Sequence, residues 1–84
     1  MPIIAKFYGI IIKMYFIQSE HNPPHLHAFY ENYVAAIQLD NLRVMSGYLP
    51  PKAMSLVLEW MKIHQQELIT MWDEQRFTKI EGLE

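Results

Sequence analysis

The chain of 84 residues contains no cysteine, which excludes a disulfide framework and a thiolate metal site. It has no long apolar run either. The longest, residues 10–17, is interrupted by Lys13 and is far shorter than the roughly 20 residues that span a bilayer. The N-terminal residues lack the apolar run and the cleavage site of a signal peptide. We therefore expect a cytoplasmic protein with no membrane partner.

Basic residues are scarce as well. The formal net charge is −2, and the Lys and Arg residues form no stripe along the sequence. Proteins that coat DNA without regard to sequence hold its phosphates with a strongly basic surface. We therefore expect no coating of DNA, whereas transient contact with RNA through a few residues stays open.

The length predicts a single domain over residues 1–84. Apolar, β-branched and aromatic residues dominate the first half and predict a sheet over about residues 2–46. The expected strands cover residues 2–8, 10–17, 25–30, 33–39 and 42–45. Polar pairs at 31–32 and 40–41 predict tight turns, and this spacing is typical of an antiparallel meander of four to five strands.

One long helix is expected after the sheet. From Ala53 to Trp72, apolar residues recur at steps of three and four, which predicts an amphipathic helix over residues 51–75. Such a helix would be about 37 Å long, so a kink near residues 64–66 would suit a small domain. Residues 77–84 read as an irregular tail. The predicted fold class is α+β, an antiparallel β-meander packed on one long C-terminal amphipathic helix.

The second predicted strand is apolar on both faces, because Ile10 and Ile12 point one way while Ile11 and Ile17 point the other. A single helix covers only one face of a sheet. An uncovered apolar face in a protein usually marks an interface. We therefore expect a homodimer or another homo-oligomer, or a small cognate protein partner. The alternative is that the tail and the strand curvature cover the second face.

Three of the four histidines, His21, His25 and His27, lie within seven residues and flank two prolines. The prolines make this segment stiff. Imidazoles titrate near neutral pH, so these three are candidate catalytic residues, acting as general base and general acid in phosphodiester cleavage. Such a reaction also needs a cation for the developing charge. The candidates for that role are Lys6, Lys13 and Arg43.

A metal site is a second interpretation of the same residues. On a strand, His25 and His27 share one face about 6.6 Å apart, and two imidazoles so placed can bind one ion. The candidate third ligands are His21, Glu31 and His64, of which His64 lies near the apolar stripe of the helix. The cofactor stays open between a divalent metal such as zinc and none, with none favoured. A purely structural role, in which the imidazoles bond to nearby carbonyls, is the third interpretation.

The whole chain resembles a known family. The resemblance rests on the opening Pro2-Ile3-Ile4, the string His21-Asn22-Pro23-Pro24-His25-x-His27, and the helix residues Glu59-Trp60, His64 and Trp72. These residues are similar to the pattern of the domain of unknown function 4160 family. The turn Glu31-Asn32 departs from it, since the family often has Gly there. The resemblance implies a small bacterial protein, encoded beside a second small protein in a toxin–antitoxin-like gene pair, and implies no particular chemistry.

Two functions follow from the sequence. The first is a protein-interaction module in a toxin–antitoxin-like pair, which binds through its uncovered apolar surface. The second is a small histidine-dependent hydrolase, a ribonuclease-like toxin, with or without a metal. Whether the protein is an enzyme stays open at this stage.

Overall fold

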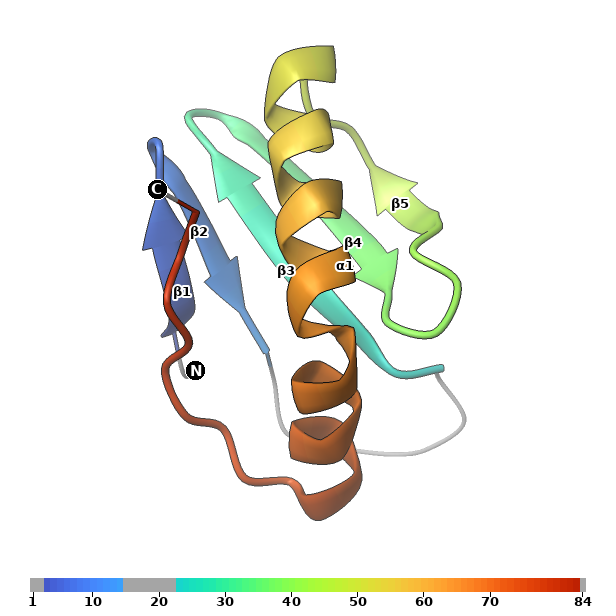
Figure 1. Ribbon diagram of the computed structural model, residues 1–84. Coiled ribbons are helices and arrows are strands. Elements are labelled where there is room, and N and C mark those ends of the chain that lie inside the picture. Colours follow the sequence, from blue (N-terminus) through green and yellow to red (C-terminus); the bar gives the residue numbers. More distant parts are fainter. Residues whose placement is uncertain (1–2, 15–22, 84) are drawn as a thin grey trace.

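The computed structural model describes residues 3–14 and 23–83 and has five strands followed by one helix (Figure 1). The strands form one antiparallel sheet in the order β1-β2-β3-β4-β5, and α1 lies across one of its faces. The predicted α+β meander packed on a long helix is thus confirmed. The elements are β1 (Ile3–Phe7), β2 (Ile10–Lys13), β3 (His25–Tyr30), β4 (Tyr33–Gln38), β5 (Val44–Gly47) and α1 (Pro51–Glu74).

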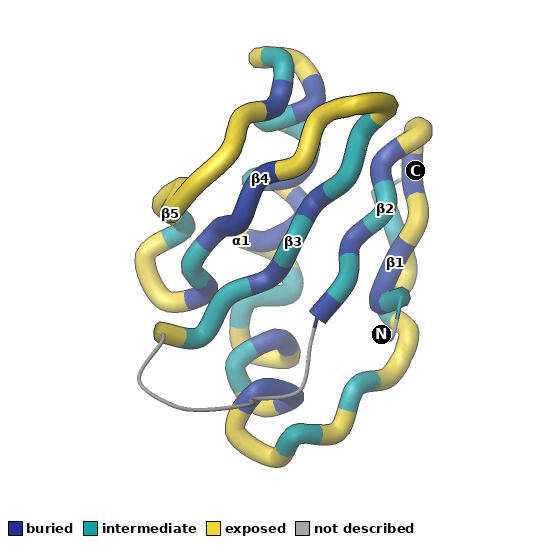
Figure 2. Tube along the Cα trace, turned by 180° about the vertical axis from the view of Figure 1, so that it is seen from behind, coloured by how far each residue is buried: buried dark blue, intermediate teal, exposed yellow. Residues whose placement is uncertain are grey.

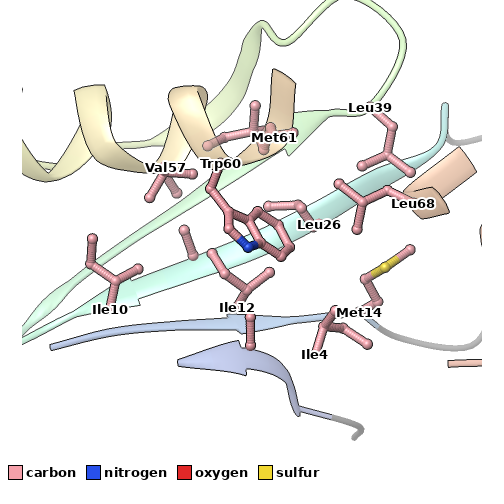
Figure 3. Packing of buried hydrophobic residues seen from close by; sticks show 14 of the residues in the cluster. Ile4, Ile10, Ile12, Met14, Leu26, Leu39, Val57, Trp60, Met61 and Leu68 are labelled. Atoms are coloured by element: carbon pink, nitrogen blue, oxygen red, sulfur yellow. The ribbon is translucent and has the colours of Figure 1, made fainter. Parts of the chain in front are cut away.

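The core lies between the sheet and α1 and is built by alternation along the strands (Figure 3). In β2, Ile10 and Ile12 point towards the helix and are buried. Trp60 of α1 is fully buried at the centre of this layer. Its ring stacks on Phe7 at 5.6 Å between centroids, and its Nε1 donates a hydrogen bond to the Glu81 carbonyl oxygen (2.8 Å). One side chain thereby joins the helix, the first strand and the C-terminal tail.

The helix begins and ends almost where the sequence predicts. Pro51 occupies its first turn, where the missing N–H costs nothing. The backbone leaves helical geometry at His64 (φ −108°, ψ 15°), which confirms the kink predicted near residues 64–66. Next to the kink, Gln65 Nε2 donates to the carbonyl oxygens of Leu39 (2.7 Å) and Asp40 (2.9 Å). The kinked turn is therefore fastened to the end of β4.

The C-terminal tail is irregular, as predicted, but it follows β1 closely (Figure 1). The Ile80 N–H donates to the Ile4 carbonyl oxygen (2.7 Å) on the outer side of β1. Gly82 lies so close to Phe7 that an added Cβ would be 2.6 Å from the Phe7 Cβ. The tail therefore covers the β1 edge of the sheet.

The fifth strand is shifted from its predicted position. The sequence predicts residues 42–45, whereas β5 runs from Val44 to Gly47. Asn41 Oδ1 accepts the Arg43 N–H (3.0 Å), and Leu42 takes a positive φ of 58°, so the chain is still turning at these residues. The predicted second strand extends to residue 17, and its last three residues lie outside the described part. No helix in residues 3–14 and 23–83 has both the length and the apolar character to cross a membrane.

Candidate functional site

Figure 2 views the sheet from the side that α1 leaves uncovered, here called the open face. The two histidines of β3 belong to this face. In β3, Leu26 and Ala28 are buried against the helix, so the alternate residues point the other way. Directly opposite residues of paired strands share a face. From the pairing, the open face comprises Lys6 and Ile11 on the β1–β2 side, Lys13, His25, His27 and Phe29 in the centre, and Val34, Ala36 and Gln38 on β4.

Three rings of β3 form a row on the open face. The centroids of His25 and His27 are 5.2 Å apart with an edge-on arrangement (67°). His27 and Phe29 are 6.4 Å apart and nearly parallel (28°). Since a strand places every second residue on one face, the pattern His-x-His-x-Phe generates this row directly. We call these three side chains the ring row.

His25 lies at the end of the ring row, beyond the last residue pair between β2 and β3. Its Nδ1 is 2.9 Å from the Pro23 carbonyl oxygen. A carbonyl only accepts, so Nδ1 carries the proton and Nε2 presents a lone pair when the ring is neutral. The ring also contacts Trp72 of α1 at 5.3 Å between centroids. The orientation of His25 is therefore fixed by the backbone on one side and the helix on the other.

Lys13 supplies a cation at the other end of the ring row. It pairs with His27 across β2 and β3, and its Nζ lies 4.9 Å from the centre of the Phe29 ring, a cation–π distance. Lys6 is exposed on the same face, one strand further out. Of the three cations that the sequence offered as stabilisers of charge, Lys13 lies beside the histidines. Arg43 lies in the connection between β4 and β5.

Charge is divided between the two layers of the molecule. The five strands contain Lys6 and Lys13 and no aspartate or glutamate. The helix carries four carboxylates, at Glu59, Glu67, Asp73 and Glu74, against two lysines, Lys52 and Lys62. The net charge of −2 is therefore unevenly distributed, because the charged side chains within the five strands are both positive. The pairing places both lysines on the same face of the sheet, Lys6 opposite Ile11 and Lys13 opposite Ile3.

The surroundings of His27 favour its neutral imidazole. Burial lowers the pKa of His27, and the adjacent His25 lowers it further. The unfolded chain binds this proton near pH 6.5, so below that pH the unfolded state binds more protons than the folded state. The contribution of His27 to the free energy of unfolding is therefore fully present above pH 6.5, and it is lost as the pH falls through the lowered pKa.

We expect the stability of wild type to fall between pH 7 and pH 5 more steeply than that of His27→Gln, which retains a polar side chain but does not titrate. Urea unfolding at several pH values measures this difference. Parallel pH profiles for wild type and His27→Gln would contradict this prediction.

In His25→Gln, the pKa of His27, followed by NMR, should rise towards 6.5, because the neighbouring positive charge is gone. Lys13 lies opposite His27 in wild type and in His25→Gln, so its effect on the pKa of His27 is the same in the two proteins.

His64 lies apart from the ring row in a contact of its own. Its Nδ1 is 2.6 Å from Glu67 Oε1, one turn on, and its ring lies 5.2 Å from that of Trp60. Its side chain is 18% exposed. This is a histidine at the margin of the core with one nitrogen bonded.

The three-histidine metal set is not assembled in the described part of the chain. Within residues 3–14 and 23–83, no group of three His, Asp or Glu side chains could hold a metal ion. Glu31 lies exposed in the turn between β3 and β4, at a positive φ of 53°. His21, the remaining candidate, lies outside the described residues. The structure thus brings together His25 and His27, and it places His64 and Glu31 elsewhere.

Phe29 is the member of the ring row that sequence reasoning missed. A phenylalanine in a predicted strand is assigned to the core by default, whereas alternation along β3 places Phe29 on the face opposite Leu26 and Ala28. The signal was available, since His25, His27 and Phe29 are spaced two apart. A cavity of about 600 Å³, lined by Tyr8, Tyr30 and the first turns of α1, lies between the sheet and the start of the helix, and no histidine lines it.

A family model described as domain of unknown function (DUF4160) matches residues 9–73, so this chain belongs to that family. No curated protein and no solved structure matches the chain significantly. The match spans the ring row and most of α1, and it assigns no chemistry to them.

Proposed function

We propose that this protein is a protein-interaction module whose β5 edge pairs with a strand of another chain. The observation that carries the proposal is the difference between the two edges of the sheet. The tail covers β1 through the bond from Ile80 to Ile4, whereas every residue of β5 is exposed. Uncovered edge strands present unpaired backbone groups and are prone to pair with other chains.

Apolar side chains gather at the same edge. Val44 of β5 is 44% exposed and Met45 is 39% exposed. Beside them, the rings of Tyr33 and Tyr48 meet edge-on at 5.7 Å, and both are exposed. Aromatic residues and methionine are enriched in protein interfaces. The edge therefore offers main-chain hydrogen bonds and an apolar contact area together.

The occupant that we propose first is a second copy of the chain, in a homodimer with a sheet continuous across a two-fold axis. Antiparallel pairing of one strand with its own copy has this symmetry, and two-fold dimers are the commonest oligomers. The biological setting that we propose is a toxin–antitoxin-like pair in a bacterial cytoplasm, in which a cognate small protein competes for the same edge. The family resemblance supports this setting.

The test is the mass of the purified chain by size-exclusion chromatography with light scattering. We expect wild type to elute as two chains and Val44→Lys to dissociate at least about tenfold more readily, because the substitution places like charges across the two-fold axis. Ile63→Lys is the matched control, since Ile63 is an exposed isoleucine on α1, far from the edge in sequence. A monomeric wild type, or equal weakening by both variants, would argue against the β5 interface.

A second candidate function, hydrolysis of a phosphodiester, is supported by the unequal environments of the two adjacent histidines. A neutral His27 suits the general base that takes the proton of the attacking hydroxyl. His25 would donate a proton to the leaving oxygen, and Lys13 would stabilise the charge that develops. Incubation of RNA with wild type, His25→Ala and His27→Ala tests this candidate. Equal integrity of the RNA in all three would remove it.

A further inference from the structure

We propose that the open face binds single-stranded nucleic acid, with bases stacked on the ring row and phosphates held by Lys6 and Lys13. This site lies on the face of the sheet, whereas the protein interface proposed above lies at its β5 edge. The proposal rests neither on that interface nor on hydrolysis. It rests on three independent features of the open face.

The first feature is the row of ring faces. His27 and Phe29 are nearly parallel, 6.4 Å apart, and both are partly exposed on an uncovered sheet. Every base has a π-face, so an unpaired strand can stack its bases on successive rings of a protein without sequence-specific hydrogen bonds. Exposed rings on an antiparallel sheet stack two or three bases in known RNA-binding modules. His25 packs against Trp72, so His27 and Phe29 are the two rings on which such a short strand would stack.

The second feature is charge. Lys13 lies beside the ring row, with its Nζ 4.9 Å from the Phe29 centroid, and Lys6 points from the same face. No carboxylate belongs to any of the five strands, and Asp40, which accepts from Gln38 at the far end of β4, lies beyond them. A neutral apolar partner would leave both lysines without a counter-charge. The face is complementary to an anion that also carries flat rings.

The third feature is the set of side chains on β2 and β4 that border the ring row. Ile11 and Val34 pair with Phe29 on either side, so Phe29 lies in an apolar band. Next to His27, Ala36 has the smallest side chain of the β4 row, so no bulky group stands between His27 and β5. Gln38 follows at the His25 end, where its Nε2 donates to Asp40 Oδ1 (3.3 Å). The apolar band around Phe29 therefore suits the flat face of a base.

The number of lysines on the open face sets the expected strength of binding to a single strand. Each phosphate neutralised on a single strand contributes a slope of about −0.7 to the dependence of log K on log salt. Two lysines predict a slope of about −1.4, far below that of proteins that coat DNA. Binding should therefore be weak to moderate and confined to short segments. This agrees with the absence of a basic stripe in the sequence.

The experiment is fluorescence anisotropy with a labelled eight-nucleotide RNA and the matching single-stranded DNA, which lacks the 2′-hydroxyl required for cleavage through it. We expect saturable binding to at least one strand, weakened about tenfold in Phe29→Leu, because one stacked base is worth about 1–3 kcal/mol. Phe29→Tyr, which keeps the ring, should bind like wild type. Lys13→Gln should weaken binding and reduce the salt slope by about 0.7.

Controls separate this site from general electrostatics and from unfolding. Lys62→Gln removes an exposed lysine on α1 and should leave the affinity unchanged. A duplex of the same sequence should bind more weakly than the single strand, since its bases are already stacked. Circular dichroism checks that each variant is folded. Absence of saturation up to about 1 mM protein, equal binding of duplex and single strand, or wild-type affinity in a folded Phe29→Leu would each overturn the proposal.

Discussion

Trp60→Ala is expected to destabilise the domain more than any other single truncation. Trp60 is fully buried, stacks on Phe7 and bonds to the Glu81 carbonyl oxygen. Truncation of a buried aromatic side chain to alanine costs about 3–5 kcal/mol, and small domains have only about 5–15 kcal/mol in total. We therefore expect Trp60→Ala to be largely unfolded near 37 °C. Urea unfolding followed by circular dichroism measures the loss.

A second variant at Trp60 and a control at the surface show how much of this loss of stability comes from the individual contacts of Trp60. Trp60→Phe retains an aromatic ring against Phe7 but removes the Nε1 donor, so it should lose much less stability than Trp60→Ala. Its remaining tryptophan, Trp72, reports unfolding by fluorescence. Ile63→Ala is the surface control, because Ile63 is 62% exposed on α1, and we expect a change within about 0.5 kcal/mol. A Trp60→Ala protein as stable as Ile63→Ala would show that the tail and helix are not joined through this side chain.

Most of the fold was predictable because its signals are local. Alternation in His25–Tyr30 and the helical periodicity from Ala53 to Trp72 fixed β3 and α1 to within a residue. The position of β5 was not predictable in this way, since it depends on a turn in which Leu42 adopts a positive φ. Leucine gives no sequence signal for that conformation. The tail was predicted as irregular, and its pairing with β1 arises from contacts between the two ends of the chain.

The candidate site was predictable in part. The spacing of His25 and His27 placed them on one face, and the structure shows them 5.2 Å apart. The participation of Phe29 and Lys13 depends on the pairing of β2 with β3, because their contact crosses strands. Register between strands is set by the packing of whole faces. The neighbours of His64 are local instead, since Glu67 and Trp60 lie one turn away on the same helix, a spacing that the sequence already contains.

Gly47→Ala is expected to detach β5 from the sheet. Gly47 has a φ of +84°, and an added Cβ would lie 2.1 Å from the Val34 carbonyl oxygen and 2.9 Å from the Ala35 Cα. Both atoms belong to the backbone of β4, so no rotamer change relieves the overlap. The same Val34 oxygen accepts the Tyr48 N–H (3.0 Å), and that bond would be lost as well. We expect a loss of about 3 kcal/mol or more.

Gly9→Ala is the matched control for this prediction, since Gly9 has nearly the same φ (+78°) but its added Cβ would meet only the Tyr30 ring at an ordinary 3.5 Å. It should cost about 1–2 kcal/mol, the penalty of the left-handed region alone. If β5 forms the dimer interface, Gly47→Ala should also be monomeric by light scattering, while Gly9→Ala remains dimeric. Amide exchange should show the loss of protection confined to β4 and β5 in Gly47→Ala. Equal stability of the two variants would mean that β4 yields to the added methyl group, and the β5 edge would then be more adaptable than its geometry indicates.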